Sequence, residues 1–187
     1  MNDNFKKQIS DIDDLNEIAQ IFSTSTELRE RISEYEKDPF SAKFSTSKNK
    51  VGIHFGKKGD TIYLLGDFNS NDKDNSSTVE IILDAMDNGL LTSAQVLDNG
   101  LFAGLIESSS KNKLGFDITT VSEMSEKDFL FLDNNPAVLV STSSDKEGKF
   151  VDFIYNNALE ITLLGHVTKG ELRIDDKSFG YIADYID

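Results

Sequence analysis

The stretch TSAQVLDNGLFAGLIESS, residues 92–109, predicts a strand, a tight turn and a helix in direct succession. Its turn is Leu97-Asp98-Asn99-Gly100, where turn-forming residues interrupt the apolar pattern. The apolar residues that follow are spaced as on one face of a helix: Leu101, Phe102, Leu105 and Ile106. The first amides of a helix have no partners inside it and often bind an anion. The stretch therefore predicts a strand-to-helix corner that is a candidate ligand site.

Two roles are open for this corner. As a ligand site it would use Asp98, Asn99 and Gly100 as substrate- or phosphate-binding residues. As a structural element it would use the side chain of Asp98 or Asn99 to cap the helix. We expect capping to be its main role.

Predicted strands and helices alternate along the rest of the chain. Short apolar runs bounded by turns predict strands at 51–55, 61–66, 114–119 and 137–143, and two more within 159–174. Helical spacing and capping boxes predict helices at 11–22, at 24–36, from Ser77 to Asn88 and after Asp145. This order is typical of an α/β or α+β fold, in which helices pack on one mixed β-sheet.

The first part of the chain differs from the remainder because it carries only helical signals. Ser10 is the expected cap of the first helix, and Thr24-x-x-Glu27 is a capping box for the second. The polar segment 41–50 is typical of a linker. We therefore divide the chain into a helical N-terminal extension with its linker, 1–48, and an α/β domain, 49–187. The sequence leaves open whether the two helices pack on their own domain or on a neighbouring molecule.

Composition excludes several functional classes. The 187 residues carry a formal charge of −14, which disfavours binding to nucleic acid and to anionic membranes. Without cysteine, and with His54 and His166 as the only histidines, we expect no metal site. No glycine-rich nucleotide motif occurs, so we expect no cofactor. The sequence contains no signal peptide or long apolar run, and the expected location is the cytoplasm.

Four blocks of the sequence, in order, resemble the C-terminal half of phosphoribosylformylglycinamidine synthase. They are FGKKGDTIYLLGD, NGLLTSAQVLDNGLFAGLIESS, LGFDIT and LLGHVTKGELRIDDKSFGYI, and the resemblance runs from about Val51 to Ile182. It implies the C-terminal domain fold of aminoimidazole ribonucleotide (AIR) synthase and a relation to purine biosynthesis. The residues before Val51 do not match the ATP-binding half of that family.

The corner departs from the family pattern S-A-H-D-x-S-D-G-G-L. Asp98 and Gly100 correspond to the pattern's Asp and its final Gly, whereas Asn99 stands where a Gly is usual. The stretch is one residue shorter than the pattern, and the pattern's His-Asp pair and Ser have no clear counterparts. Gln95 and Val96, which follow Ser93-Ala94, do not titrate. The resemblance thus implies a corner that has lost part of its chemistry.

A second family block, L-F-G-E-x-x-x-R, is also altered. Asp133 replaces the Glu, and Ala137 stands where an Arg would hold the substrate phosphate. Alanine offers no donor for such a contact. Asp133 joins Asp98, Asn99 and Gly100 as a candidate substrate- or phosphate-binding residue, and we expect no catalytic residue.

Three functional hypotheses follow. The first is a non-catalytic binding or assembly module related to purine biosynthesis. The second is one part of an ATP-dependent, amidine-forming ligase, whose composite site a separate ATP-binding half would complete and which would bind a nucleotide or ribotide weakly. The third is a homo-oligomer. Whether the chain is an enzyme is left open by the sequence.

Overall fold

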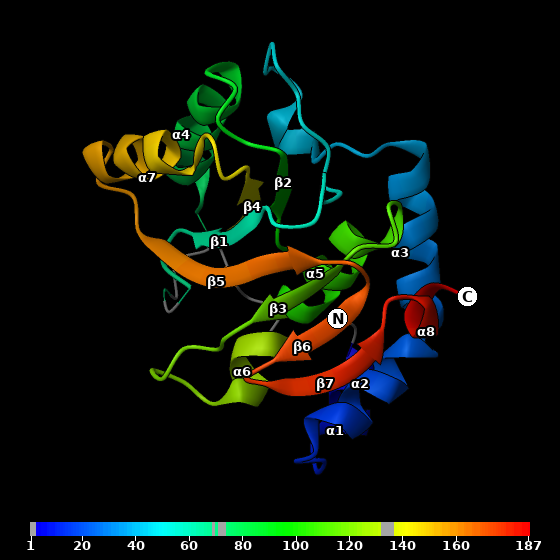
Figure 1. The fold of residues 1–187 in the computed structure, drawn as a ribbon. Coiled ribbons are helices and arrows are strands. Elements are labelled where there is room, and N and C mark those ends of the chain that lie inside the picture. The colour runs from blue at the N-terminus through cyan, green and yellow to red at the C-terminus, as the bar shows by residue number, and fades with distance from the viewer. Residues whose placement is uncertain (1–2, 69, 71–73, 132–136) are drawn as a thin grey trace.

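Strand β1 (Thr61–Leu65) is buried on both of its faces and lies inside the sheet. The computed structural model describes residues 3–68, 70, 74–131 and 137–187 (Figure 1). In this part of the chain seven strands form one sheet in the order β2-β4-β1-β5-β3-β6-β7. Neighbouring strands are antiparallel except for β3 and β6, which are parallel. The predicted fold class, a mixed sheet packed by helices, is confirmed.

Helices and strands are interspersed along the rest of the chain. In chain order they are α1 (Asp3–Ile9), α2 (Leu15–Ser23), α3 (Thr26–Lys37), a 3₁₀ turn (Ala42–Phe44), α4 (Ser76–Asp87), β2 (Ser93–Val96), α5 (Leu101–Ser110), β3 (Gly115–Ile118), α6 (Glu126–Phe131), β4 (Val138–Thr142), α7 (Glu147–Asn156), β5 (Ile161–Thr168), β6 (Glu171–Ile174), β7 (Lys177–Tyr181) and α8 (Ala183–Ile186). Within the described residues, no helix combines the length and apolar character needed to cross a membrane.

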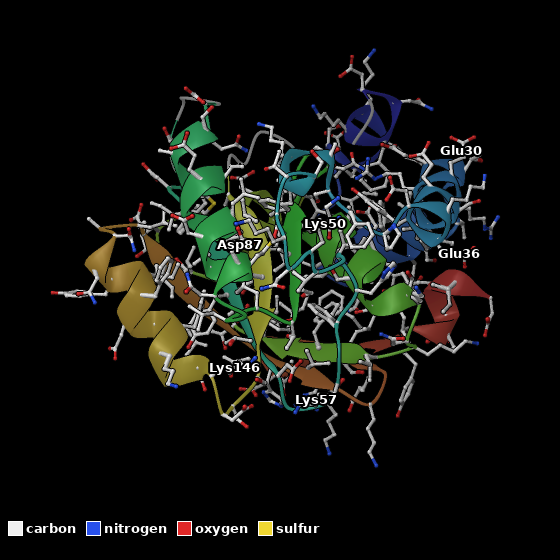
Figure 2. All side chains as sticks on the ribbon, turned by 90° about the horizontal axis from the view of Figure 1, so that it is seen from above. Glu30, Glu36, Lys50, Lys57, Asp87 and Lys146 are labelled. Carbon is white, nitrogen blue, oxygen red and sulfur yellow. The ribbon has the colours of Figure 1, made fainter. Side chains whose placement is uncertain are left out.

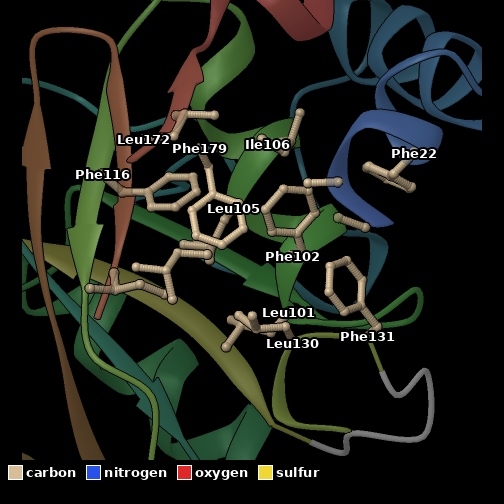
Figure 3. Close-up of a cluster of buried hydrophobic side chains, with 14 of the residues drawn as sticks. Phe22, Leu101, Phe102, Leu105, Ile106, Phe116, Leu130, Phe131, Leu172 and Phe179 are labelled. Carbon is tan, nitrogen blue, oxygen red and sulfur yellow. The ribbon is translucent and has the colours of Figure 1, made fainter. Parts of the chain in front are cut away.

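Two hydrophobic cores lie on opposite faces of the sheet. Successive side chains of β1 alternate between them, with Ile62 and Leu64 in one core and Tyr63 and Leu65 in the other. The first core is centred on Phe102 of α5, whose ring centroid lies 5.7 Å from that of Phe22 and 5.1 Å from that of Phe131 (Figure 3). The second core lies between the sheet and the helices α4 and α7. The sheet is thus the shared wall of both cores.

The N-terminal helices pack on the first core, so they belong to the same compact unit as the sheet. Phe5 of α1, Phe22 of α2 and Leu28 of α3 are all buried there. The segment 41–50 is docked as well, because Phe44 is buried in the second core and Ser47 donates to Asp87 of α4. The division at residue 48 stays a prediction about domain boundaries.

The predicted strand at 51–55 is wrong. Its backbone makes isolated hydrogen bonds to three separate segments, through Ile53 to Pro39, Gly52 to Ala94 and Phe55 to Ser108. Ile53, His54 and Phe55 are all buried, so burial does not alternate as in a strand with one solvated face. An apolar run can therefore be buried without a strand beside it.

Several helix ends also differ from the prediction. Asp14 caps α2 and Ser25 caps α3, in place of Ser10 and Thr24. Helix α4 begins after Asn75, two residues before the predicted cap. The hydroxyls of Ser10 and Thr24 instead donate to carbonyl groups of the preceding turn. Five short elements were not predicted from the sequence, namely α1, the 3₁₀ turn, α6, β7 and α8.

Candidate functional site

The corner between β2 and α5 forms where the sequence places it. Gly100 has φ 89° and ψ 160°, a conformation that is essentially restricted to glycine. Gly100 is the N-cap residue of α5, and no side chain caps the helix. The expectation that Asp98 or Asn99 caps α5 is therefore wrong. The turn is instead made possible by the missing Cβ of Gly100.

Asp98 is bound by a residue from the N-terminal extension. The Arg31 Nη2 atom of α3 lies 2.6 Å from Asp98 Oδ1, although 67 positions separate the two residues in the sequence. The Asp98 side chain remains 61% exposed, whereas that of Arg31 is 19% exposed. Arg31 thus reaches the candidate site from outside the region that resembles the synthase.

The same guanidinium binds a buried carboxylate. Arg31 Nε donates to Glu107 Oε1 of α5, and Nη2 lies 3.3 Å from Glu107 Oε2. Glu107 is 1% exposed and also accepts a hydrogen bond from the Gln95 side-chain amide. Gln95 Oε1 accepts from the Ser108 hydroxyl at 2.9 Å. We call this polar network of Arg31, Gln95, Asp98, Glu107 and Ser108 the corner network.

The charges of the corner network shift the pKa values of its members. Burial raises the pKa of Glu107, while the hydrogen bond and charge of Arg31 oppose this shift. Burial alone would lower the pKa of Arg31, but Glu107 and Asp98 raise it above its ordinary value, so the guanidinium stays protonated. The pKa of Tyr35 is raised by burial and by the charge of Glu107. The corner network therefore holds a fixed positive charge between two acids.

Asn99 is the one predicted corner residue whose side chain is left with a free donor. It is 4% exposed, and among the described residues its Nδ2 atom has no hydrogen-bond partner. A buried amide donor without a partner is costly in free energy unless water or a ligand accepts from it. Asn99 directly precedes Gly100, the N-cap residue of α5.

A cleft of about 400 Å³ opens beside the corner. It lies between the extension and the end of β2, and its lining includes Arg31, Tyr35, Lys43, Val96 and Asp98. The Arg31 guanidinium carbon lies 5.7 Å from the centre of the Tyr35 ring. The cleft has room for a small organic molecule.

The second family block lies partly outside the described residues. Asp133 is among the positions outside them, together with residues 132 and 134–136. Ala137 is buried, and its carbonyl accepts from the backbone amide of Leu97 at 3.3 Å. The two blocks are therefore adjacent at Leu97 and Ala137.

The grouping of Arg31, Gln95 and Glu107 was not predicted from the sequence. A usable signal was present, because Glu107 is a charged residue within the apolar helix LFAGLIESSS. A carboxylate on a buried helix needs a cationic partner. The sequence alone does not say which of its 19 basic residues that partner is.

Comparisons with known proteins relate the chain to the PurL subunit of phosphoribosylformylglycinamidine synthase. No protein-family model matches. The Leuconostoc mesenteroides PurL subunit is 33% identical across 51% of this chain, and the Carboxydothermus hydrogenoformans subunit is 34% identical across 46%. The matches span only 16% and 12% of those proteins. The chain is thus related to a part of PurL.

Solved structures agree on the fold. Thermotoga maritima PurL complexed with ATP superposes with a TM-score of 0.62 and 15% identity, over 74% of this chain and 27% of that one. PurLQS from the same organism gives a TM-score of 0.57 and 18% identity, over 65% and 24%. The chain has an AIR synthase-like fold of the PurL type.

Proposed function

We propose that this chain is a phosphoribosylformylglycinamidine synthase-like domain related to purine biosynthesis that acts as a non-catalytic binding or assembly module in the cytoplasm. The observation that carries the proposal is the corner network. Asp98, which the resemblance makes a ligand residue, is bound at 2.6 Å by Arg31 of the same chain. Gln95, which follows the retained Ser93-Ala94 and does not titrate, donates to the buried Glu107.

Two further features support this proposal. A carboxylate neutralised within its own chain is less available to a ligand than a free one. Neither Gln95 nor Val96 provides a titrating group at physiological pH, so this part of the corner has no general acid or base. A scaffold is retained around a corner that lacks these groups, which suits association better than catalysis.

The test is an activity assay on the full chain without other proteins. With ATP, glutamine and formylglycinamide ribonucleotide, we expect no formation of the amidine product. Product formed by the purified chain, and absent from a matched preparation of the Gly100→Ala variant, would overturn the proposal. The Gly148→Ala variant is the control, because Gly148 lies on α7 with open space around it.

A second candidate function is a composite ligase site, completed by a separate ATP-binding half. The observation that favours it is the buried Asn99 amide, which has no partner among the described residues. In the sequence Asn99 lies between Asp98, which lines the cleft of about 400 Å³, and Gly100, the N-cap of α5. A phosphate or ribotide oxygen is the kind of acceptor that this amide and the first helix amides would bind. Thermotoga maritima PurL has been solved as a complex with ATP.

Calorimetry separates the two candidates. The composite site predicts heat on titration of the full chain with ATP, ADP, AMP or formylglycinamide ribonucleotide at millimolar concentration. It further predicts that Asn99→Ala weakens this binding at least tenfold, while Asn156→Ala, an exposed change on α7, leaves it unchanged. Absence of heat with all four ligands would leave the non-catalytic module as the better proposal.

A further inference from the structure

Asp60, at the start of β1, is a buried acid with no role in the corner. Its side chain is 0% exposed, and among the described residues neither carboxylate oxygen has a hydrogen-bond partner. The backbone around it is firmly held, because the Val167 amide donates to the Asp60 carbonyl and the Gly59 amide donates to Val167, both at 2.9 Å. Buried charges in proteins are normally paired or bound to a cation. The Asp60 carboxylate is therefore a candidate to bind a cation.

The surroundings of Asp60 offer space and oxygen atoms. A Cβ placed on Gly56 would lie 3.3 Å from Asp60 Oδ2 and 3.7 Å from the Cβ of Thr92. The carboxylate, Gly56 and Thr92 therefore meet at one point, where a methyl group on Gly56 would crowd the carboxylate; we call this point the cradle. Burial raises the pKa of Asp60, and Thr92 and the Lys57 amide oppose this rise by favouring the ionised carboxylate. Neither of them makes a hydrogen bond of ordinary geometry with it.

A chain of hydroxyl groups continues from Thr92 into the protein. Thr92 Oγ1 lies 2.8 Å from Ser141 Oγ, which lies 2.6 Å from Ser93 Oγ. Ser141 and Ser93 are 0% and 2% exposed. Two hydrogen bonds among three hydroxyls use two of their three hydrogens. At most one hydrogen remains for Asp60, so the hydroxyls alone do not satisfy both carboxylate oxygens.

We propose that Asp60, Thr92 and the cradle at Gly56 bind a monovalent cation, Na⁺ or K⁺. Carboxylate and hydroxyl oxygens are the ligands that hard cations prefer. One buried carboxylate among neutral oxygens balances a single positive charge. In the described part of the chain no three His, Asp or Glu side chains form a metal-binding group, which disfavours a divalent ion.

Two charged groups near this site act on Asp60 in opposite directions. Lys57 and Asp145 both influence Asp60 electrostatically, Lys57 by favouring its charge and Asp145 by opposing it. Lys57 and Lys146 lie on one side of the molecule, at the bottom of Figure 2, away from Glu30 and Glu36 of α3. Lys57 is exposed, and no ion pair joins it to Asp60 among the described residues. The cation would thus link the 56–60 loop to the start of β2.

The test is the melting temperature of the full chain in NaCl, KCl or tetramethylammonium chloride at equal ionic strength. Tetramethylammonium is too large for the cradle. We expect Na⁺ or K⁺ to raise the melting temperature by about 3–6 °C over tetramethylammonium. The increase should saturate as K⁺ or Na⁺ replaces tetramethylammonium, because a single site fills.

Three variants test whether the difference in melting temperature between the salts arises at Asp60. Asp60→Asn should abolish the difference between the salts and be at least as stable as the natural chain in tetramethylammonium, because it removes an unpaired buried charge. Gly56→Ala, which places a methyl group in the cradle, should reduce the difference. Asp145→Asn, an exposed change nearby, should preserve it.

Each opposite outcome overturns the proposal. Equal melting temperatures in all three salts would mean that water satisfies Asp60. A salt difference that persists in Asp60→Asn would place the effect elsewhere. Stabilisation by millimolar Mg²⁺ or Ca²⁺ but not by Na⁺ or K⁺ would indicate a divalent site.

Discussion

The two ends of strand β2 each bury a carboxylate, and they treat it differently. Near the C-terminal end, Glu107 is 1% exposed and is bound by Arg31 and by Gln95 of the strand. Near the N-terminal end, Asp60 is 0% exposed, and among the described residues its carboxylate has no hydrogen-bond partner. The first charge is compensated by an arginine of the same chain, whereas the second has no such partner among the described residues.

This difference shows what the N-terminal extension contributes. Arg31 comes from α3, and its guanidinium fixes that helix against α5 at the candidate corner. Extension and corner are therefore one structural unit, even though the resemblance to the synthase begins only near Val51. Removing Arg31, the partner of Glu107, should therefore lower the stability of the fold, whereas neutralising Asp60 should not.

The largest expected effect follows from removing the compensating cation. Arg31→Met leaves Glu107 buried without its ion pair, which should lower the free energy of unfolding by about 3–5 kcal/mol. The measurement is urea unfolding near neutral pH. Arg29→Met, an exposed change on the same helix, is the control and should alter stability by no more than about 0.5 kcal/mol.

A double variant separates the buried charge from simple loss of packing. Arg31→Met combined with Glu107→Met removes both charges and should recover most of the lost stability. If the double variant is as unstable as Arg31→Met, the cost lies in packing of α3 and the contrast with Asp60 is not one of charge.

His54 is a second buried group that, like Asp60, has an atom without a hydrogen-bond partner among the described residues, and its effect on stability depends on pH. It is 8% exposed, its Nε2 atom has no partner among the described residues, and burial with the nearby charge of Lys111 lowers its pKa from 6.5 to about 4. Because the pKa of His54 is lower in the folded chain than in the unfolded chain, the unfolded chain binds the proton more readily. The free energy of unfolding should therefore be constant above pH 6.5 and fall as the pH drops from 6.5 to 4. The loss should amount to about 3 kcal/mol.

The measurement is unfolding free energy between pH 7 and pH 4. His54→Gln should flatten this part of the profile, whereas His166→Gln, which changes an exposed histidine on β5, should leave it unchanged. A profile that stays equally steep in His54→Gln would assign the pH dependence to other titrating groups.

The regular elements were predictable from sequence because their signals are local. The apolar run of β1 and the helical spacing of α5 are visible in the sequence alone, and both elements were correctly predicted. The segment 51–55 was mistaken for a strand because its burial comes from three segments that are distant in the sequence. Local patterns contain no information about such contacts.

The candidate site was predictable in its backbone but not in its electrostatics. The turn at Gly100 is visible in the sequence, since Asn-Gly after an apolar run is a strong turn signal. The pairing of Arg31 with Asp98 and Glu107 spans 67 and 76 positions and depends on how α3 packs. For the same reason Asp60 could not be recognised as buried, because in the sequence it simply follows a turn and precedes a strand.

A smaller effect is expected at the turn itself. Gly100→Ala places a Cβ at φ 89° and ψ 160°, which should cost about 1–3 kcal/mol of unfolding free energy. Gly148→Ala on α7 is the matched control, because nothing lies within 4 Å of its added Cβ. It should stabilise the chain by about 0.5–1 kcal/mol. Equal effects of the two changes would mean that the corner does not depend on the glycine conformation.

The smallest effect is expected for Asp98→Asn. This change removes the exposed ion pair of Arg31 and keeps its buried ion pair with Glu107. Asp98 is 61% exposed, and solvent screens its ion pair with Arg31, so the change should cost no more than about 1 kcal/mol in urea unfolding. Asp152→Asn, an exposed change on α7, is the control. If Asp98→Asn costs as much as Arg31→Met, then Asp98 rather than Glu107 anchors the guanidinium. The contrast between the two ends of β2 would then rest on a surface ion pair instead of a compensated buried charge.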